Sequence, residues 1–218
     1  YKNHRELAKD DEIDAVAAIL PHAANGPVAR DLLSAGKHVL LEKPLGVSVA
    51  QGRSMVDAAA QAGVHLCVGY MKRFDAGVRW AREAIQAWRA EGKAPTFVRA
   101  HCYGGDWVCG NDERIVTDEP YPAIEIESGG PEGWDDEAKQ DVQVFANIYA
   151  HNPNLVRFLL GGEMSVLSVT PHQDHMLVAL AAGDTLVSLE CGGMACQWWD
   201  EVTTTYFADG FVDVKTPS

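Results

Sequence analysis

The stretch Ala35-Gly-Lys-His-Val-Leu-Leu-Glu-Lys-Pro-Leu45 decides how the rest of this chain is interpreted. Its glycine is the type of residue that ends a helix, and His38–Leu41 then form a short apolar run typical of a strand. A carboxylate, an amine and a proline follow directly, at Glu42, Lys43 and Pro44. Because ligands of open α/β sheets bind outside the carboxyl ends of the strands, this pattern predicts that Lys43 serves chemistry rather than packing.

Strand and helix patterns alternate on both sides of this stretch. Apolar runs at 14–20 and 64–68 have the length and continuity of buried parallel strands. Helical patterns separate them, at 26–34 with a C-cap at Gly36, and at 48–62. This order predicts βαβ units in a parallel sheet, which we interpret as the second half of a doubly wound, Rossmann-like domain.

The pattern changes after an amphipathic helix predicted at 78–90. A strand is expected at 96–101, with no partner helix nearby. A helical pattern over 138–160 contains Pro153, which should bend or break the helix between residues 149 and 152.

A series of strand patterns follows residue 164, with hairpin turns expected at 182–184 and 208–210. The predicted strands are 165–170, 175–181, 185–191, 201–207 and 211–215. The predicted fold class is therefore α/β followed by α+β. A partial doubly wound parallel sheet occupies residues 1–93, and a mostly antiparallel open sheet forms a substrate and oligomerisation domain over residues 94–218.

Composition excludes several classes of partner. The 218 residues carry a net charge of −13, which argues against nucleic acid or an anionic membrane as a partner, because phosphate binding needs a basic surface. No apolar run approaches the roughly 20 residues that span a bilayer. Acidic residues are concentrated in the segment 106–137, which also lacks periodicity and is predicted to be a long loop that is either functional or mobile.

The cysteines indicate a reducing compartment. There are five of them, without a CxxC pair or a secretion signal, so free thiols in the cytoplasm are expected. A metal site is not predicted, because His172 and Asp174 face one side of a strand while His175 faces the other. The chain opens with Tyr1 rather than methionine, and we expect both of its ends to be cuts through a larger protein.

The string Gly36-Lys-His-Val-Leu-Leu-Glu-Lys-Pro44 resembles the Gfo/Idh/MocA family, the relatives of glucose-fructose oxidoreductase and inositol dehydrogenase. Three further segments resemble the family in the same order. Residues 14–21 resemble its strand that ends in a proline over the cofactor. Gly69-Tyr-Met-Lys-Arg-Phe-Asp75 resembles the segment that links its two domains, and His151-Asn-Pro-Asn-Leu-Val-Arg-Phe-Leu-Leu-Gly161 resembles the one that holds its active-site histidine.

The resemblance implies NAD or NADP as the cofactor. Family members begin with a Gly-x-Gly-x-x-Gly turn that holds the dinucleotide pyrophosphate, and no segment of this sequence matches it between a strand and a helix. We therefore expect one βαβαβ half to be missing before Tyr1 and part of the sheet after Ser218. The fragment alone should then be inactive and bind the cofactor weakly or not at all.

The family's catalytic residues correspond here to Lys43 and His151. A lysine beside the cofactor can hold the substrate oxygen and favour the developing alkoxide, although most lysines after a strand are simply solvated. The family carries aspartates where this chain has Asn147 and Asn154, and an amide cannot take a proton. Both are predicted to bind substrate, as is Tyr149 unless it belongs to the core. His151 either shares the proton transfer with Lys43 or only binds substrate, unless it merely caps carbonyls at the break near Pro153.

Six residues are candidates for cofactor binding: Pro21, His22, Asn25, Glu42, Lys43 and Arg73. His22 and Asn25 either contact the adenosine and ribose or form a plain turn. Glu42 either orients Lys43 or contacts the nicotinamide ribose, unless it simply pairs with a nearby basic side chain. Arg73 either contacts the nicotinamide end or makes an ion pair between domains. The tryptophans either stack on a sugar or cover the sheet: Trp107, Trp134, Trp198 and Trp199.

The resemblance thus predicts an NAD(P)-dependent dehydrogenase that acts on a secondary alcohol or ketone of a sugar, cyclitol or related polyol. Its partners would be that small substrate and further copies of itself, joined through the C-terminal sheet. A non-catalytic nucleotide-binding regulator or scaffold of the same fold is the alternative, because the two asparagines replace expected carboxylates. A degraded gene without function is a third interpretation.

Overall fold

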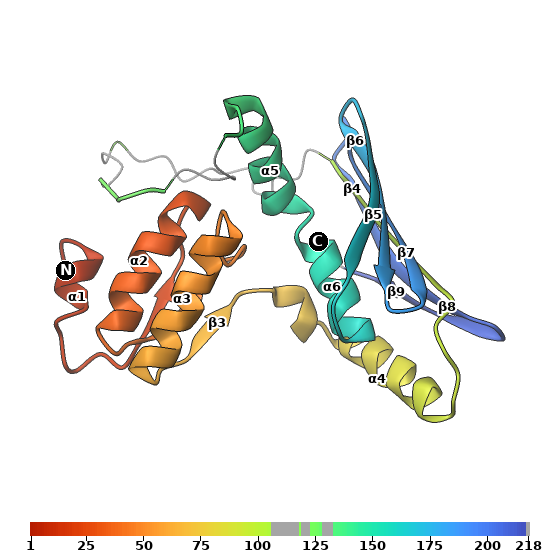
Figure 1. The fold of residues 1–218 in the computed structure, drawn as a ribbon, viewed down its shortest axis with the longest axis horizontal. Coiled ribbons are helices and arrows are strands. Elements are labelled where there is room, and N and C mark those ends of the chain that lie inside the picture. Colours follow the sequence, from red (N-terminus) through yellow and green to blue (C-terminus); the bar gives the residue numbers. More distant parts are fainter. Residues whose placement is uncertain (106–117, 119–122, 128–132, 217–218) are drawn as a thin grey trace. The chain divides into compact units, whose positions relative to one another are not determined.

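The computed structural model describes residues 1–105, 118, 123–127 and 133–216 of the chain (Figure 1). The chain forms two compact units, each made from two pieces of the sequence. The first consists of Tyr1–Tyr70 with Asp118–Ala150, and the second of Met71–Thr117 with His151–Ser218. The two units alternate along the chain, whereas the predicted domains, residues 1–93 and 94–218, are each continuous. The boundary between residues 93 and 94 remains a prediction.

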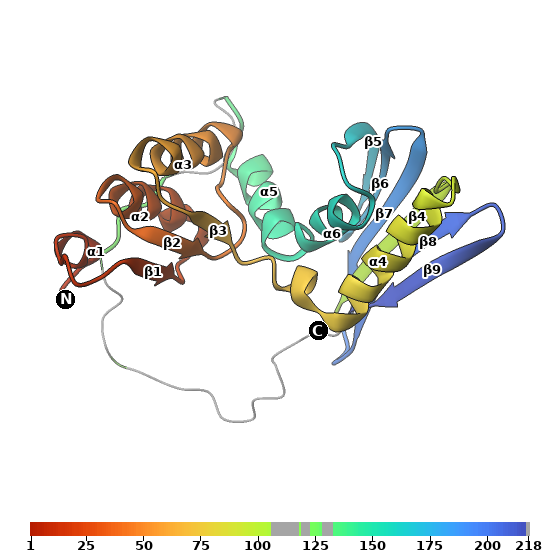
Figure 2. The ribbon, with the colours of Figure 1, turned by 90° about the horizontal axis from the view of Figure 1, so that it is seen from below.

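A three-stranded parallel sheet forms the centre of the first unit. Its strands, in spatial order, are β1 (Ala15–Ala18), β2 (His38–Leu41) and β3 (Leu66–Val68). Helices α2 (His22–Ser34) and α3 (Val49–Ala62) connect them and cover one face of the sheet (Figure 2). The βαβ arrangement predicted from the alternating apolar runs is confirmed.

Apolar side chains between this sheet and its helices form the core of the first unit. Its most buried large members are at most 2% exposed: Leu32, Leu33, Val39, Leu41 and Met55. Burying one such side chain contributes roughly 1.5–3 kcal/mol, so this packing outweighs the weak intrinsic preference of such short strands. The short helix α1 (His4–Leu7) and helix α5 (Asp136–Ile148) complete the unit.

Helix α2 begins four residues earlier than the sequence predicted, at His22 rather than Gly26. Pro27 lies inside it and has no N–H, so the carbonyl of Ala23 loses its helical partner. The backbone N–H of Glu127, from the other piece of the unit, donates to that carbonyl at 2.9 Å. A residue distant in the sequence therefore supplies the hydrogen bond that Pro27 cannot.

Other helix ends follow local signals. Ser48 caps α3 by accepting a backbone N–H at 3.1 Å, and Gly63 ends α3 with a φ of 68°. The predicted break near Pro153 is confirmed, since α5 ends at Ile148 and α6 (His151–Leu160) begins three residues later. Pro153 lies in the first turn of α6, where a missing N–H is tolerated.

The second unit contains a six-stranded sheet. Its strands, in chain order, are β4 (Phe97–Gly104), β5 (Ser165–His172), β6 (His175–Ala182), β7 (Thr185–Gly193), β8 (Trp199–Phe207) and β9 (Gly210–Lys215). Their spatial order is β5-β6-β7-β4-β8-β9, and only β4 and β7 pair in parallel. The mostly antiparallel open sheet and its two predicted hairpin turns are confirmed.

Helices α4 (Ala76–Ala90) and α6 pack on one face of this sheet (Figure 2). Their contacts with the sheet form a second core of Val78, Ala81, Ile85, Leu155, Leu159, Phe207, Val212 and Val214. A short 3₁₀ helix, η1 (Met71–Phe74), precedes α4. The opposite face of the sheet carries the paired side chains of Arg99 and Glu190, and apolar side chains such as Leu177 and Phe211 that are 51% and 61% exposed.

Most of the acidic segment 106–137, including Trp107, lies outside the described residues. In the part of the chain that the structure describes, no helix is long and apolar enough to cross a membrane. Within the same part, no three His, Cys, Asp or Glu side chains are grouped to hold a metal ion.

Candidate active site

The carboxyl ends of the three parallel strands meet at one edge of the first unit's sheet. Ala18, Leu41 and Val68 are aligned across β1, β2 and β3. The residues that follow each strand therefore emerge at this edge, and among them are Glu42 and Lys43. The peptide bond between Lys43 and Pro44 is cis.

Asn25 holds the turn after β2 in place. Its side chain is fully buried, and its Nδ2 donates to the carbonyl oxygens of Glu42 at 3.0 Å and of Pro44 at 3.1 Å. The carboxylate of Glu42 accepts the backbone N–H of Lys43 at 3.1 Å. These contacts make Asn25 a residue that shapes the turn, and its predicted contact with the cofactor remains a prediction.

Lys43 contacts helix α5. Its Nζ donates to the backbone oxygen of Asn147 and to Oδ1 of the same residue, the latter at 3.2 Å. The structure thus brings together two of the predicted site residues from distant parts of the sequence. Tyr149 lies just past the end of α5, and its ring centroid is 5.9 Å from that of Phe145.

His22 opens helix α2 at the same edge, directly after the exposed Pro21. Burial lowers the pKa of His22, and the positive charge of Lys43 lowers it further, against a smaller opposing effect of Glu42. A neutral imidazole therefore lies near the Lys43 ammonium at neutral pH. Because His22 and Asn25 both lie in helix α2, the plain turn considered for this segment is wrong.

The second unit holds the remaining predicted site residues. His151 is half-buried and begins α6. Arg73 of η1 donates from Nε to Oδ1 of Asn154 at 2.7 Å, and its guanidinium carbon lies 5.3 Å from the centre of the Phe158 ring. A joint site of Lys43 and His151 remains a prediction, since these residues belong to different units.

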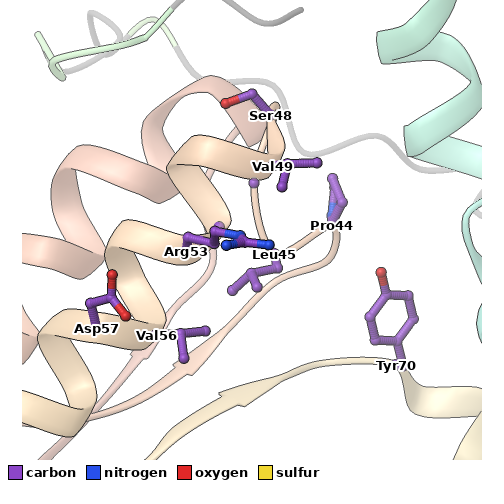
Figure 3. A pocket seen from close by; sticks show the side chains of 10 residues that line it. Pro44, Leu45, Ser48, Val49, Arg53, Val56, Asp57 and Tyr70 are labelled. Atoms are coloured by element: carbon purple, nitrogen blue, oxygen red, sulfur yellow. The ribbon is translucent and has the colours of Figure 1, made fainter. Parts of the chain in front are cut away.

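A cavity of about 450 Å³ adjoins the turn at Pro44, within the first unit (Figure 3). Pro44 and Tyr70 lie at one end, Val56 and Asp57 at the other, and Arg53 lies between them (Figure 3). The other lining residues are Leu45, Gly46, Ser48, Val49 and Gly52. The sequence predictions missed this cavity, although positions 49, 53, 56 and 57 share one face of a helix that begins beside the turn.

Comparisons with known proteins agree with this fold. Residues 1–70 match the family model described as "Oxidoreductase family, NAD-binding Rossmann fold", the Gfo/Idh/MocA model. Myo-inositol 2-dehydrogenase of Thermotoga maritima is 31% identical over 168 residues, which are 75% of this chain and 41% of that protein. The 1,5-anhydro-D-fructose reductase of Ensifer adhaerens is 26% identical over 207 residues, or 94% of this chain and 56% of that protein.

Solved structures show the same fold. The myo-inositol dehydrogenase of Lactobacillus casei, in complex with NAD(H) and myo-inositol, superposes with a TM-score of 0.75 at 19% identity, covering all of this chain and 59% of that one. A Rossmann-type parallel sheet followed by an open antiparallel sheet is the fold that this chain shares with that dehydrogenase. Residues 1–70 are therefore similar to the Gfo/Idh/MocA family, and 75% of the chain is similar to each of two inositol dehydrogenases. It spans 26% to 56% of the length of the first three curated relatives that it matches.

Proposed function

We propose that the protein is an NAD- or NADP-dependent oxidoreductase acting on a secondary alcohol or ketone of a sugar, cyclitol or related polyol. The observation that carries this proposal is Lys43, held after a parallel strand by a buried asparagine, in a chain whose relatives include inositol dehydrogenases. The names of those relatives support polyols as the substrate class and leave the individual polyol open.

The groups at the strand edge suit a dinucleotide. Glu42 offers a carboxylate that can accept hydrogen bonds from ribose hydroxyls, and Lys43 and the first turn of α2 offer positive charge and N–H donors. A bound nicotinamide would supply the carbon that accepts or donates the hydride. Pro21, His22 and Glu42 are the residues we assign to its ribose side, and Arg73 to its nicotinamide end.

Lys43 is proposed to hold the substrate oxygen. Its ammonium can donate a hydrogen bond to a hydroxyl or carbonyl and stabilise negative charge that develops there during hydride transfer. Asn147 accepts from the same ammonium and cannot take a proton, so its role is to direct the Lys43 donors. We assign the proton transfer to His151, and substrate contacts to Asn147, Tyr149 and Asn154.

Replacing Lys43 tests the proposal. In the protein expressed from its complete coding sequence, Lys43→Met should lower turnover of a polyol at least about a hundredfold, the usual scale for a donor positioned at a developing oxyanion. Lys139→Met is the matched control, because Lys139 lies on α5 and pairs only with a neighbouring carboxylate of that helix among its described ion pairs. Near-normal turnover of the Lys43 variant would show that the assignment is wrong.

A non-catalytic nucleotide-binding regulator is the second candidate. The amides of Asn147 and Asn154 favour it, because neither can act as an acid or base. A panel of polyols and ketosugars, followed through the absorbance of reduced nicotinamide, separates the two functions. Cofactor binding without turnover of any compound would support the regulator.

We also propose that copies of the protein associate through the face of the six-stranded sheet that α4 and α6 leave uncovered. Exposed apolar side chains on that face support the proposal: Leu177, Leu186, Tyr206 and Phe211. The reducing cytoplasm remains our proposal for its location, supported by the cysteines, which are unpaired among the described residues.

A further inference from the structure

Glu201 is a fully buried carboxylate in the core of the second unit. It lies on β8, on the face covered by the helices, and forms an ion pair with Lys72 of η1, whose side chain is 8% exposed. Nδ2 of Asn152, at the second position of α6, donates to Oε1 of Glu201 at 3.0 Å. Nε1 of Trp199 donates to Oε2 at 2.8 Å. One carboxylate therefore receives donors from η1, α6 and its own strand.

Stability alone is a poor explanation for this arrangement. Removing a carboxylate and an ammonium from water is costly, and apolar residues of similar volume are often as stable as a buried ion pair. Two buried thiols lie nearby. Cys102 on β4 pairs with Glu201 across the sheet and Cys191 on β7 pairs with Cys102, and burial raises the pKa of each thiol to about 12. A buried ion pair with several directed hydrogen bonds does, however, fix the relative position of the elements that it joins.

The elements joined by Glu201 carry proposed active-site residues. Lys72 is the neighbour of Arg73, and Asn152 is the neighbour of His151. A second contact, from Arg73 to Asn154, ties η1 to the same turn of α6 at 2.7 Å. The first turn of α6 is therefore held from two sides, and the Glu201 contact is the one next to His151.

We propose that Glu201 is a positioning residue, which fixes the first turn of α6, and with it the imidazole of His151, against η1 through Asn152 and Lys72. Its consequence for catalysis rests on the proposed function of His151, whereas the positioning itself does not. Glu201 touches neither substrate nor cofactor in this assignment. It acts through the side chain of Asn152, the residue next to the histidine.

The test compares three variants of the 218-residue chain: Glu201→Leu, Asn152→Ala and the double variant Lys72→Met/Glu201→Gln. The first two remove the acceptor or the donor next to His151. The double variant removes both charges but leaves an amide oxygen for Asn152, and so should keep the turn in place. Thr205→Val is the control, because Thr205 is equally buried on the same face of β8 and its hydroxyl has no hydrogen-bond partner among the described residues.

The readout is the NMR signal of the His151 ring, assigned with a His151→Asn variant. We expect it to shift in Asn152→Ala and Glu201→Leu, and to keep its position in the double variant and the control. Asn152→Ala leaves the Lys72–Glu201 ion pair intact, and so remains informative if Glu201→Leu fails to fold. An unchanged His151 signal in Asn152→Ala would overturn the proposal, whatever the effect on stability.

Turnover supplies the second readout, in the protein from the complete coding sequence. Because a displacement of about 1 Å can cost about a hundredfold in rate, Asn152→Ala should lower kcat by up to that factor and leave cofactor affinity unchanged. A shifted His151 signal with full turnover would keep the positioning and reject the catalytic role of His151. An inactive parent protein would reject the proposed function and leave the NMR result standing.

Discussion

Lys43 and His22 lie close enough at the strand edge for the charge of one to affect the pKa of the other. Burial of the imidazole is the larger cause of the lowered pKa of His22, and the ammonium adds to it. We predict that Lys43→Met raises this pKa but leaves it below its ordinary value, since the burial remains. Titration of the His22 ring signal by NMR checks the result, with Lys139→Met as a variant that should change nothing.

The same lowered pKa has a consequence for stability. A histidine that binds its proton less readily when folded favours the unfolded chain at low pH. The contribution of neutral His22 to the free energy of unfolding is therefore fully present above the ordinary pKa of a histidine. It is lost as the pH falls through the lowered pKa of the folded protein. Lys43→Met should reduce that loss, and a pKa of His22 that is identical in both proteins would contradict the electrostatic link.

For single residues, the sequence indicated candidates for the site but gave little information about the contacts that they make. The position of Lys43 after a strand follows from local pattern, and the pairing of Lys43 with Asn147 fits the resemblance. Asn25 reaches carbonyls 17 and 19 residues further along the chain. A contact of that separation depends on how α2 packs beside β2, which no local pattern contains.

The segment Ala123–Glu127 shows how an element depends on distant groups. Glu127 donates its N–H to helix α2, its carboxylate pairs with Arg30, and Gln51 donates to the same carboxylate at 2.6 Å. Ile124 packs against the core of the first unit. The hydrogen bonds from Arg30 and Gln51 lower the pKa of Glu127, so this attachment persists above the ordinary pKa of a glutamate and weakens as the pH falls through the lowered value.

Arg30→Met should loosen this segment. An exposed ion pair contributes roughly 0.2–1 kcal/mol, so the hydrogen-exchange protection of the Glu127 amide should fall by up to about fivefold. Arg53→Met on the neighbouring helix α3 is the control, because Arg53 lines the cavity instead. Equal protection in the two variants would show that the backbone hydrogen bond and Ile124 suffice without Arg30.

Element boundaries were predictable where the signal is local and wrong where it is not. Pro153 marked the break between α5 and α6, since proline is tolerated best in the first turn of a helix. The predicted start of α2 at Gly26 was four residues late, because the helix continues through Pro27 back to His22. Glu127, a hundred residues further along the chain, makes that helix possible.

For the whole molecule, the order of strands and helices was sufficient to predict the fold class. Period-two patterns between turn residues gave the antiparallel strands, and continuous apolar runs gave the parallel ones. The spatial order β5-β6-β7-β4-β8-β9 was not predictable, because β4 precedes the others in sequence yet lies between β7 and β8. The sequence also did not show that residues 118–150 belong to the first unit.

The uncovered sheet face is large enough for a stable association. Strands about 4.8 Å apart that rise about 3.3 Å per residue give six strands of about eight residues an area of roughly 600 Å². Side chains that protrude from it raise this toward the roughly 800 Å² per partner of a standard interface. Phe97, Tyr206 and Phe211 form an aromatic row on this face, with neighbouring ring centroids 6.2 and 6.1 Å apart.

Phe211→Glu should therefore weaken the association of copies. The side chain is 61% exposed in the single chain, so the substitution leaves the core intact while it places a carboxylate in the aromatic row of the proposed contact. Trp80→Glu on α4 is the matched control, since Trp80 is 63% exposed on the helix side of the same unit. Sedimentation should show Phe211→Glu dissociating at protein concentrations at which the parent and Trp80→Glu remain associated. Equal dissociation of both variants, or a parent that is monomeric at every concentration, would reject this face as the interface.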